Sequence, residues 1–512
     1  MKKKTQQKIE FGDFQTPLPL ARKVSLLLKE LGCSPLSILE PTCGEGSFIF
    51  ASLESFSSVE NAIAIDINST YTKKLAKKLE NDSRVKVFES DFFDTDWNKI
   101  LHNLADPLLI IGNPPWVTNS ELSSLGSENL PRKENSQKRS GISAITGASN
   151  FDISEWMLLK IFAWARTRKA MVAMLCKTSV ARKVLLNEWK NNPNSGISKI
   201  FTIDALADFG ASVDACLLVH DFNNSGENNC TVFNKLSTSA KQTSFGYQKN
   251  QLIANIDLYK KWAFLQNETK NKNYVWRSGI KHDASKIMEL KRADGRYINN
   301  LGELVDIEEK FLYPMMKSSD VAKGGLPTRF MLVPQHFIGE ETKQIQFLAP
   351  KTWAYFSKNH YYFQRRKSSI YKNKPFFSIF GVGDYSFSPW KVAISGLYKK
   401  LYFHIIAPYE GKPVVLDDTC YFLPCQNEEE AKLITSLLNS KTAIGFYSSF
   451  IFWDAKRPIT AKILNKLNIM ALAKFFQAKE IMPQEQYLEY FSKPEQLMLM
   501  EQRAIYGEQN NK

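Results

Sequence analysis

The sequence predicts an α/β protein, in which a doubly wound parallel sheet is followed by a second domain of mixed α+β structure. Three observations predict this. From about Ser37 to Val219, short apolar runs alternate with helical stretches, which is the pattern of parallel strands joined by crossover helices. Glycines and acids stand where the apolar runs end, as they do at the ligand-binding strand ends of such sheets. Beyond about residue 250, aromatic residues interleave with Lys and Arg instead.

The first predicted strand and helix enclose a glycine-rich turn. Ser37–Glu40 is predicted as the strand and Ser47–Leu53 as the helix, with the turn Pro41–Gly46 between them. Gly44 and Gly46 let the backbone press closely against a ligand at the N-terminus of the helix. A phosphate-binding loop uses the same geometry, but the Lys-Ser/Thr pair of such a loop is missing. The turn therefore predicts a ligand site of another kind.

Two acids follow at the ends of the next predicted strands, Ala62–Asp66 and Val85–Phe88, which a basic helix separates. Asp66 comes about twenty residues after the glycine turn, where a carboxylate accepts the hydroxyls of a ribose. Asp91 is placed to accept from an exocyclic adenine amine, and Phe92 beside it offers an apolar face. Turn and acids together predict a site for a nucleoside cofactor.

A fourth apolar run, Leu108–Ile111, leads into Asn113, Pro114, Pro115 and Trp116. This tetrapeptide presents an amide oxygen, a backbone carbonyl whose direction the two prolines restrict, and a flat apolar face. All three groups suit one planar amino group. The sequence therefore predicts a site that methylates an amine.

Two polar stretches interrupt the alternation of predicted strands and helices, and the second is the predicted domain boundary. A polar stretch, 118–150, contains Arg132, Lys133, Lys138 and Arg139; it is too long and polar for an ordinary connection and is either a surface insertion or a flap over nucleic acid. The predicted alternation resumes with a helix at 155–165 and a strand at 171–175, and closes with a strand pair at 208–219. The polar stretch 222–250 is predicted as the boundary between domains 1–250 and 251–512.

Net charge and the spacing of the cysteines indicate which partners and cofactors to expect. The net charge is +15: residues 1–250 carry 30 Lys and Arg against 26 Asp and Glu, and residues 251–512 carry 37 against 26. The basic second half favours a polyanionic partner such as nucleic acid, and Arg365, Arg366 and Lys367 are hypothesised to touch DNA. Seven cysteines stand without a CxxC pair or zinc spacing, so free thiols in a reducing cytoplasm and no metal are expected. With no signal-peptide pattern and no long apolar run, no membrane partner is expected.

These motifs, in this order, resemble the gamma-class S-adenosylmethionine-dependent adenine-N6 methyltransferases of DNA. The resemblance covers about the first 220 residues closely and the rest more loosely. It implies a Rossmann-like methyltransferase domain at 1–250, a DNA target-recognition domain at 251–512, S-adenosylmethionine as cofactor and double-stranded DNA as partner. It also implies a cytoplasmic protein, nucleoid-associated in action in a prokaryotic cell. Its role would be the modification component of a restriction-modification or similar system whose endonuclease is a separate protein.

The resemblance also assigns residues. Asn113, Pro114, Pro115 and Trp116 match the catalytic motif, with Trp where Tyr or Phe is commoner. Phe209 is the candidate for the ring that stacks on the acceptor base opposite Trp116, although its motif is one residue short of the family pattern. The cofactor-binding residues that it implies are Thr16, Pro17, Glu40, Pro41, Thr42, Gly44, Gly46, Asp66, Asp91 and Phe92.

An adenine amine is a poor nucleophile because its lone pair is delocalised into the ring. Accepting both of its hydrogens frees that lone pair, so orientation and hydrogen bonding replace a general base. The base must first be flipped out of the duplex.

Other acceptors are alternatives: a protein glutamine, a guanine N2 of RNA, or cytosine N4, whose enzymes usually carry Ser at the position of Asn113. A catalytically inactive DNA-binding scaffold would show decay at Asp66, Asp91 or Asn113, and none is visible.

Overall fold

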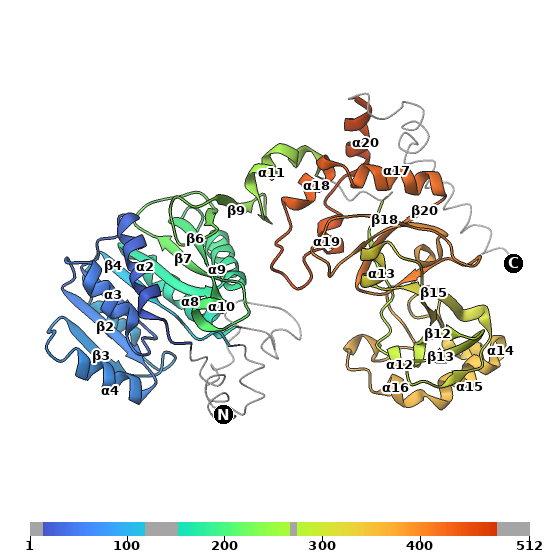
Figure 1. Ribbon diagram of the computed structural model, residues 1–512, viewed down its shortest axis with the longest axis horizontal. Coiled ribbons are helices and arrows are strands. Elements are labelled where there is room, and N and C mark those ends of the chain that lie inside the picture. Colours follow the sequence, from blue (N-terminus) through green and yellow to red (C-terminus); the bar gives the residue numbers. More distant parts are fainter. Residues whose placement is uncertain (1–13, 118–151, 267–273, 479–512) are drawn as a thin grey trace. The chain divides into compact units, whose positions relative to one another are not determined.

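The computed structural model describes residues 14–117, 152–266 and 274–478 (Figure 1). The chain divides into two compact units, Met1–Ile256 and Asp257–Lys512, a division six residues beyond the expected boundary. The polar stretch 118–150, for which an insertion or a flap is expected, lies outside the described residues.

Unit 1 is built from strands that alternate with helices. Its elements are α2 (Leu18–Glu30), β1 (Ser37–Glu40), α3 (Ser47–Ser55), β2 (Asn61–Asp66), α4 (Ser69–Lys78), β3 (Val85–Glu89), α5 (Trp97–His102), β4 (Leu108–Gly112), α8 (Ile153–Ala165), β5 (Ala170–Lys177), α9 (Thr178–Asn191), β6 (Ile197–Ile203), α10 (Ala205–Phe209), β7 (Ala215–Asp221), β8 (Asn229–Phe233), β9 (Gln242–Gln248) and β10 (Gln251–Ile253).

The strands of unit 1 form one ten-stranded sheet in the order β10-β9-β8-β6-β7-β5-β4-β1-β2-β3. Strands β1 to β5 pair in parallel, whereas β7 runs antiparallel between β5 and β6. The chain winds from β1 outward to β3 and then returns to β4 on the other side of β1. The winding therefore reverses between β1 and β4, where doubly wound sheets bind ligands beyond the carboxyl ends of the strands.

Helices cover both faces of this sheet, because its central strands are apolar on both sides. Leu109 and Ile111 of β4 belong to the same buried cluster as Leu28 of α2 and Phe48 of α3. Side chains alternate along a strand, so the equally buried Ile110 points to the opposite face, and α8 and α9 contact β4, β5 and β7. The predicted α/β doubly wound fold is confirmed.

Two local expectations for unit 1 are wrong. Asp208, Phe209 and Gly210 do not begin a strand pair; they end the short helix α10, which Asp204 caps through Ala207 N and which Gly210 closes in a left-handed conformation with φ +66°. The polar stretch 222–250 contains β8 and β9, which pair in the sheet beside β6. Both strands are only partly buried, since most of their positions are half-buried or exposed, and this explains the polarity.

Unit 2 is a mixture of short helices and mostly antiparallel strands. Its elements are α11 (Ile256–Trp262), η1 (Ala263–Leu265), β11 (Arg277–Ser278), α12 (Ser285–Met288), β12 (Glu289–Ala293), β13 (Arg296–Asn299), β14 (Leu304–Val305), η2 (Glu309–Phe311), β15 (Leu312–Met316), α13 (Ser318–Lys323), β16 (Arg329–Leu332), η3 (Thr342–Gln344), α14 (Ile345–Leu348), α15 (Pro350–Lys358), α16 (His360–Gln364), η4 (Ser369–Tyr371), η5 (Asp384–Phe387), β17 (Trp390–Ser395), β18 (His404–Ile406), β19 (Val415–Leu416), β20 (Cys420–Cys425), α17 (Glu428–Leu438), α18 (Lys441–Ser448), α19 (Ala461–Leu464) and α20 (Ile469–Ala478).

These elements form a four-stranded sheet, β11-β20-β17-β18, and a six-stranded sheet, β14-β13-β12-β16-β15-β19. Only the β15–β19 pair of the six-stranded sheet is parallel. Between α19 and α20 the helical structure is interrupted, and there Asn468 N donates to Leu265 O and Leu467 forms a bridge with Gln266. Among the described helices, none is both long and apolar enough to span a bilayer.

Candidate active site

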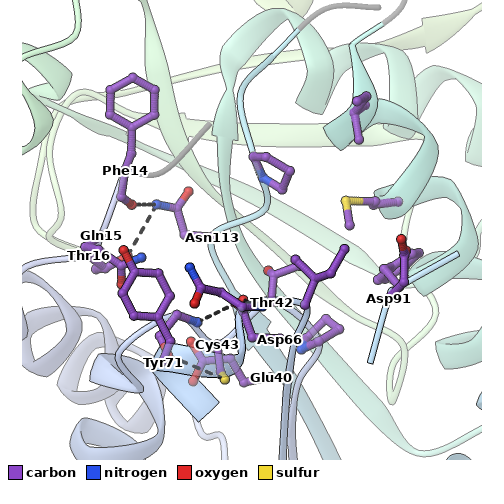
Figure 2. A pocket seen from close by; sticks show the side chains of 18 of the residues that line it. Phe14, Gln15, Thr16, Glu40, Thr42, Cys43, Asp66, Tyr71, Asp91 and Asn113 are labelled. Carbon is purple, nitrogen blue, oxygen red and sulfur yellow. Dashed lines mark hydrogen bonds between the residues drawn. The ribbon is translucent and has the colours of Figure 1, made fainter. Parts of the chain in front are cut away.

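A pocket lies where the winding of the sheet reverses, at the carboxyl ends of β1, β2, β3 and β4 (Figure 2). It encloses about 1080 Å³ of non-protein space, counting its open mouth. Residues that line it include Phe14, Gln15, Thr16, Glu40, Pro41, Thr42, Cys43, Gly44, Ser47, Asp66, Asn68, Tyr71, Ser90, Asp91, Phe92, Asn113, Pro115 and Met157. Its walls thus come from segments that are far apart in the sequence.

The glycine turn forms the floor of this pocket between β1 and α3. Gly44 has φ +50° and Gly46 has φ +83°, a region that residues with a Cβ rarely adopt. A Cβ on Gly44 would stand 2.4 Å from Gln15 Oε1, and a Cβ on Gly46 would stand 2.3 Å from Leu75 Cδ1. Gly44 thus borders the pocket, whereas Gly46 serves the packing of α3 against α4.

The two predicted acids line the pocket from neighbouring strands. Asp66 follows the buried part of β2 and accepts from Gly44 N at 2.8 Å and from Asn68 N at 2.8 Å. Asp91 follows β3 and accepts from Phe93 N at 2.7 Å. These backbone bonds hold both carboxylates at the strand ends, where each retains further acceptor sites for a ligand.

Phe92 is nearly buried and is supported from behind by two tryptophans. Its ring centroid lies 4.9 Å from that of Trp97 and 5.6 Å from that of Trp164. Trp97 Nε1 also donates to Phe92 O at 2.8 Å. The cluster fixes the loop after β3, so that the Asp91–Phe92 pair has a defined direction.

Glu40 ends β1 as a carboxyl group that is 2 % exposed. Its Oε2 accepts from Ile49 N at 3.1 Å. Burial raises the pKa of Glu40 well above its usual range, and the nearby Asp66 carboxylate raises it further, against the lowering effect of the Ile49 bond. The pocket therefore holds a carboxyl group that a cationic ligand would ionise.

Asn113 stands directly after β4 with its amide oriented by bonds to the segment before α2. Asn113 Nδ2 donates to Phe14 O at 2.9 Å and to Thr16 Oγ1 at 3.3 Å (Figure 2). Asn113 Oδ1 is buried and has no hydrogen-bond partner among the described residues. An unsatisfied buried acceptor costs about 1–3 kcal/mol, so this oxygen points to a donor that arrives with a ligand.

Three aromatic rings gather beside Asn113. The Trp116 centroid lies 5.2 Å from that of Phe209, at an interplanar angle of 67°, and 5.8 Å from that of Phe14. Trp116 is 5 % exposed. Trp116 and Phe209, predicted to face each other across a base, thus lie in direct contact in this structure.

Most predicted site residues come together at this pocket: Thr16, Glu40, Pro41, Thr42, Gly44, Asp66, Asp91, Phe92, Asn113 and Pro115 line it. Pro17 instead begins α2, with its carbonyl accepting from Leu20 N and Ala21 N. Sequence reasoning did not assign Phe14, Gln15 or Tyr71. Gln15 and Phe14 adjoin the assigned Thr16, whereas Tyr71 lies within α4 and carries no pattern that distinguishes it.

The three basic residues expected to touch DNA lie in unit 2 and differ from one another. Arg365 and Lys367 are exposed, and Arg365 stacks on Tyr361. Arg366 donates to the carbonyls of Ser378, Phe376 and Phe363 at 2.6, 3.0 and 3.2 Å, and burial lowers its pKa. The N–H groups of the Arg366 guanidinium are therefore used in hydrogen bonds to the backbone of unit 2, and nothing in this placement supports a contact between Arg366 and DNA.

Metal ligands do not gather anywhere in the described ranges: no group of three or more His, Cys, Asp or Glu side chains there has the arrangement of a metal site. The seven cysteines are buried free thiols. Burial also raises the pKa of Cys43, with further contributions from Glu40 and Asp66, which keeps this thiol protonated and unreactive in the pocket wall.

Comparison with known proteins gives one close relative and a fold likeness. The chain is 48% identical over 473 residues to the type II methyltransferase M.NspV of Nostoc sp., covering 91% of this chain and 98% of that protein. It is similar in fold to the type IIL restriction-modification enzyme MmeI, solved in complex with DNA, with a TM-score of 0.51, 13% identity and coverage of 98% of this chain and 73% of that one. The type IIG restriction endonuclease BpuSI gives a TM-score of 0.37 at 15% identity, over 91% of this chain and 61% of that one. No known family description matches the chain.

Proposed function

This chain belongs to the type II methyltransferases, and from that premise we propose that it transfers a methyl group from S-adenosylmethionine to the N6 amine of a flipped-out adenine in duplex DNA. The proposal includes its role as the modification component of a restriction-modification system. The observation that carries it is the buried Oδ1 of Asn113, which has no hydrogen-bond partner within the described ranges and shares one pocket with the glycine turn and two strand-end acids.

The pocket residues fit S-adenosylmethionine as the methyl donor. Asp66 would accept from the ribose, and Asp91 with Phe92 would receive the adenine ring. Glu40 would accept from the cationic ammonium of the methionine part. Thr42 Oγ1, a buried hydroxyl without a partner among the described residues, would donate to the methionine carboxylate. When bound, the donor supplies a methyl group that its sulfonium has already activated.

The acceptor chemistry rests on Asn113 and Pro114. The Asn113 Oδ1 atom and the Pro114 carbonyl would each accept one hydrogen of the acceptor amine. Accepting both hydrogens draws the nitrogen toward tetrahedral geometry and frees its lone pair. Because the site supplies orientation and acceptors, no side chain needs to remove a proton before transfer.

The aromatic contacts bear on how a base enters. Trp116 is covered by Phe14 and Phe209 in this structure, so a base that stacks on Trp116 must push these rings apart. Phe209 is the last residue of α10, followed by the left-handed Gly210. A movement of this helix end would not break any strand pairing of the sheet. We assign Phe209 the role of the second ring over the flipped base.

Replacing Phe209 by Ala is expected to raise the KM for DNA by at least about 5-fold, because stacking of a base on one aromatic ring contributes about 1–3 kcal/mol. Donor affinity should stay unchanged. Steady-state kinetics on a duplex carrying the target sequence measures both quantities. The Phe88→Ala variant, at an aromatic residue that is 40% exposed, serves as the control. An unchanged KM for DNA would remove Phe209 from the acceptor site.

Unit 2 is proposed to bind the duplex, with Arg365 and Lys367 among its phosphate contacts. Each phosphate contact on B-DNA contributes about 0.9 to the slope of log K against log salt. The Arg365→Ala/Lys367→Ala double variant should therefore lower the magnitude of that slope by about 2 and weaken binding to all sequences alike. Fluorescence anisotropy over a salt series measures it. Lys351→Ala/Lys432→Ala is the matched control, since both lysines are exposed and already paired with acids. Equal slopes for the two double variants would place the contacts elsewhere.

The whole proposal is tested by expressing the protein in cells that lack adenine methylation and sequencing their DNA with methylation-sensitive reads. Methylation of adenine within one sharp sequence motif is the expected result. Methylation of cytosine instead would show that the acceptor is a cytosine and not the N6 amine of adenine. Unmodified DNA, with methyl transfer to RNA or protein in lysates, would overturn the DNA assignment. The absence of any transfer, with donor binding retained, would favour a binding scaffold.

A further inference from the structure

The segment Phe14–Gln15–Thr16, called the strap below, lies beside Asn113 (Figure 2). Gln15 Oε1 accepts from Glu45 N at 2.9 Å, in the glycine turn. On the other side of the strap, Phe14 O and Thr16 Oγ1 both accept from Asn113 Nδ2. One short segment thus joins the floor of the donor pocket to the amide of the acceptor site.

The Phe14 carbonyl decides which way the Asn113 amide faces, and the Thr16 hydroxyl adds a second bond that anchors the amide. A backbone carbonyl accepts hydrogen bonds and never donates them, so Phe14 O requires the NH2 end of the amide on its side. The oxygen end must then face the opposite way, and this atom is buried with no hydrogen-bond partner in the part of the chain that the structure describes. A reversed amide would set its oxygen against Phe14 O and would lose that bond, whereas the Thr16 hydroxyl, which can donate as well as accept, would keep the amide in place in either orientation.

We propose that Thr16 is a positioning residue, which together with the Phe14 carbonyl holds the Asn113 amide in the orientation that accepts from an amine. The inference rests on the proposed function. In the reversed orientation, the NH2 of Asn113 would meet the NH2 of the acceptor base, donor against donor. The strap therefore makes the site selective for an amino group over a ring carbonyl. It also gives Thr16 a role distinct from the donor contact expected from the sequence.

The test compares Thr16→Val, which keeps the shape of the side chain but loses the hydroxyl, with Thr16→Ser, which keeps the hydroxyl. One neutral hydrogen bond to a reacting group corresponds to a change of about 3- to 10-fold. We expect Thr16→Val to lower the single-turnover rate of methyl transfer at saturating donor and DNA by that factor, and Thr16→Ser to restore it to within about twofold. The dissociation constant for S-adenosylhomocysteine, measured by calorimetry, should be the same in all three proteins.

Other outcomes overturn the inference in distinguishable ways. A weaker dissociation constant for Thr16→Val at an unchanged single-turnover rate would make Thr16 a donor contact. Equal rate losses in Thr16→Val and Thr16→Ser, accompanied by a lower Tm, would make it a packing residue. Equal rates in all three would show that Phe14 O orients the amide alone. A wild-type protein that methylates no DNA would instead overturn the proposed function, before the variants are compared.

Discussion

Replacing Asn113 by Ala is expected to lower the rate of methyl transfer about 100- to 1000-fold, because removal of one preorganised hydrogen-bonding group at the reacting atom has an effect of this size. Donor binding should be preserved, since the Asn113 amide bonds only to Phe14 O and Thr16 Oγ1 among its described contacts. Single-turnover kinetics with saturating donor and DNA measures the rate, and calorimetry with S-adenosylhomocysteine measures the binding.

Stability gives a second measurement on the same variant. Asn113 Oδ1 is a buried acceptor that no described residue satisfies, so its removal eliminates an unfavourable group together with two hydrogen bonds of the Nδ2 atom. We expect a change in Tm of no more than a few degrees, which separates a catalytic loss from unfolding. Asn81→Ala, at an exposed position between α4 and β3, is the matched control. Near-normal turnover in Asn113→Ala would refute the hydrogen-bonding role.

Replacing Glu40 by Gln is expected to weaken donor binding about 10- to 100-fold, because a hydrogen bond to a charged partner contributes about 1.5–3 kcal/mol. The variant keeps the size of the side chain and loses only the charge. Calorimetry with S-adenosylhomocysteine, which carries the same ammonium group, measures the loss. Glu60→Gln, at an exposed position, is the control. Equal affinity in wild type and Glu40→Gln would show that Glu40 does not meet the cationic end of the donor.

The pH dependence follows from the raised pKa of Glu40. When folding raises the pKa of a carboxyl group, the group makes its full contribution to the free energy of unfolding at pH values below its unfolded pKa, near 4.5. This contribution is lost as the pH rises through the folded pKa. At pH above the folded value, the donor-free Glu40→Gln protein should therefore be more stable than wild type. Thermal unfolding over a pH series tests this, and a lower Tm for Glu40→Gln at high pH would contradict it.

Donor binding should show the complementary pH trend. A cationic ligand favours the ionised carboxylate and lowers its pKa, so wild-type affinity should rise with pH until Glu40 is ionised in the free protein as well. In Glu40→Gln this contribution should vanish. Calorimetry in buffers of different ionisation enthalpy detects the proton released on binding, and equal proton release in both proteins would assign the titration to another group.

The strands that carry the pocket, β1 to β4, were predictable from the sequence because their signal is local. β1, β3 and β4 begin at the residues predicted for them. The last residue of each strand lies no more than one residue beyond its predicted end. Strands buried on both faces read as continuous apolar runs, and the polar residues that end them, Asp66 and Asn113 among them, mark the edge where ligands bind. The sequence also indicated most of the pocket wall, since parallel strands bring their carboxyl ends to one edge whatever lies between them.

Other features could not be read locally. The polar strands β8 and β9 resemble a linker in composition, and only their pairing in the sheet, β8 with β6 and β9 with β8, makes them strands. The basic run at 365–367 looks uniform, yet the guanidinium of Arg366 donates to four backbone carbonyls, those of Phe363, His282, Ser378 and Phe376. Whether a charged side chain faces solvent or the protein depends on partners that no window of sequence contains.

By itself, the sequence determined the sheet, the order of its motifs and the residue types at its carboxyl edge, because hydrophobic periodicity and turn chemistry act over a few neighbouring residues. Only the tertiary structure decided which way the Asn113 amide faces, since its two acceptors stand 97 and 99 positions earlier in the chain. It also decided that Glu40 is a buried carboxyl group and that Trp116 is covered by Phe14 and Phe209. Burial and hydrogen-bond direction arise from contacts between distant segments, and these exist only once the chain has folded.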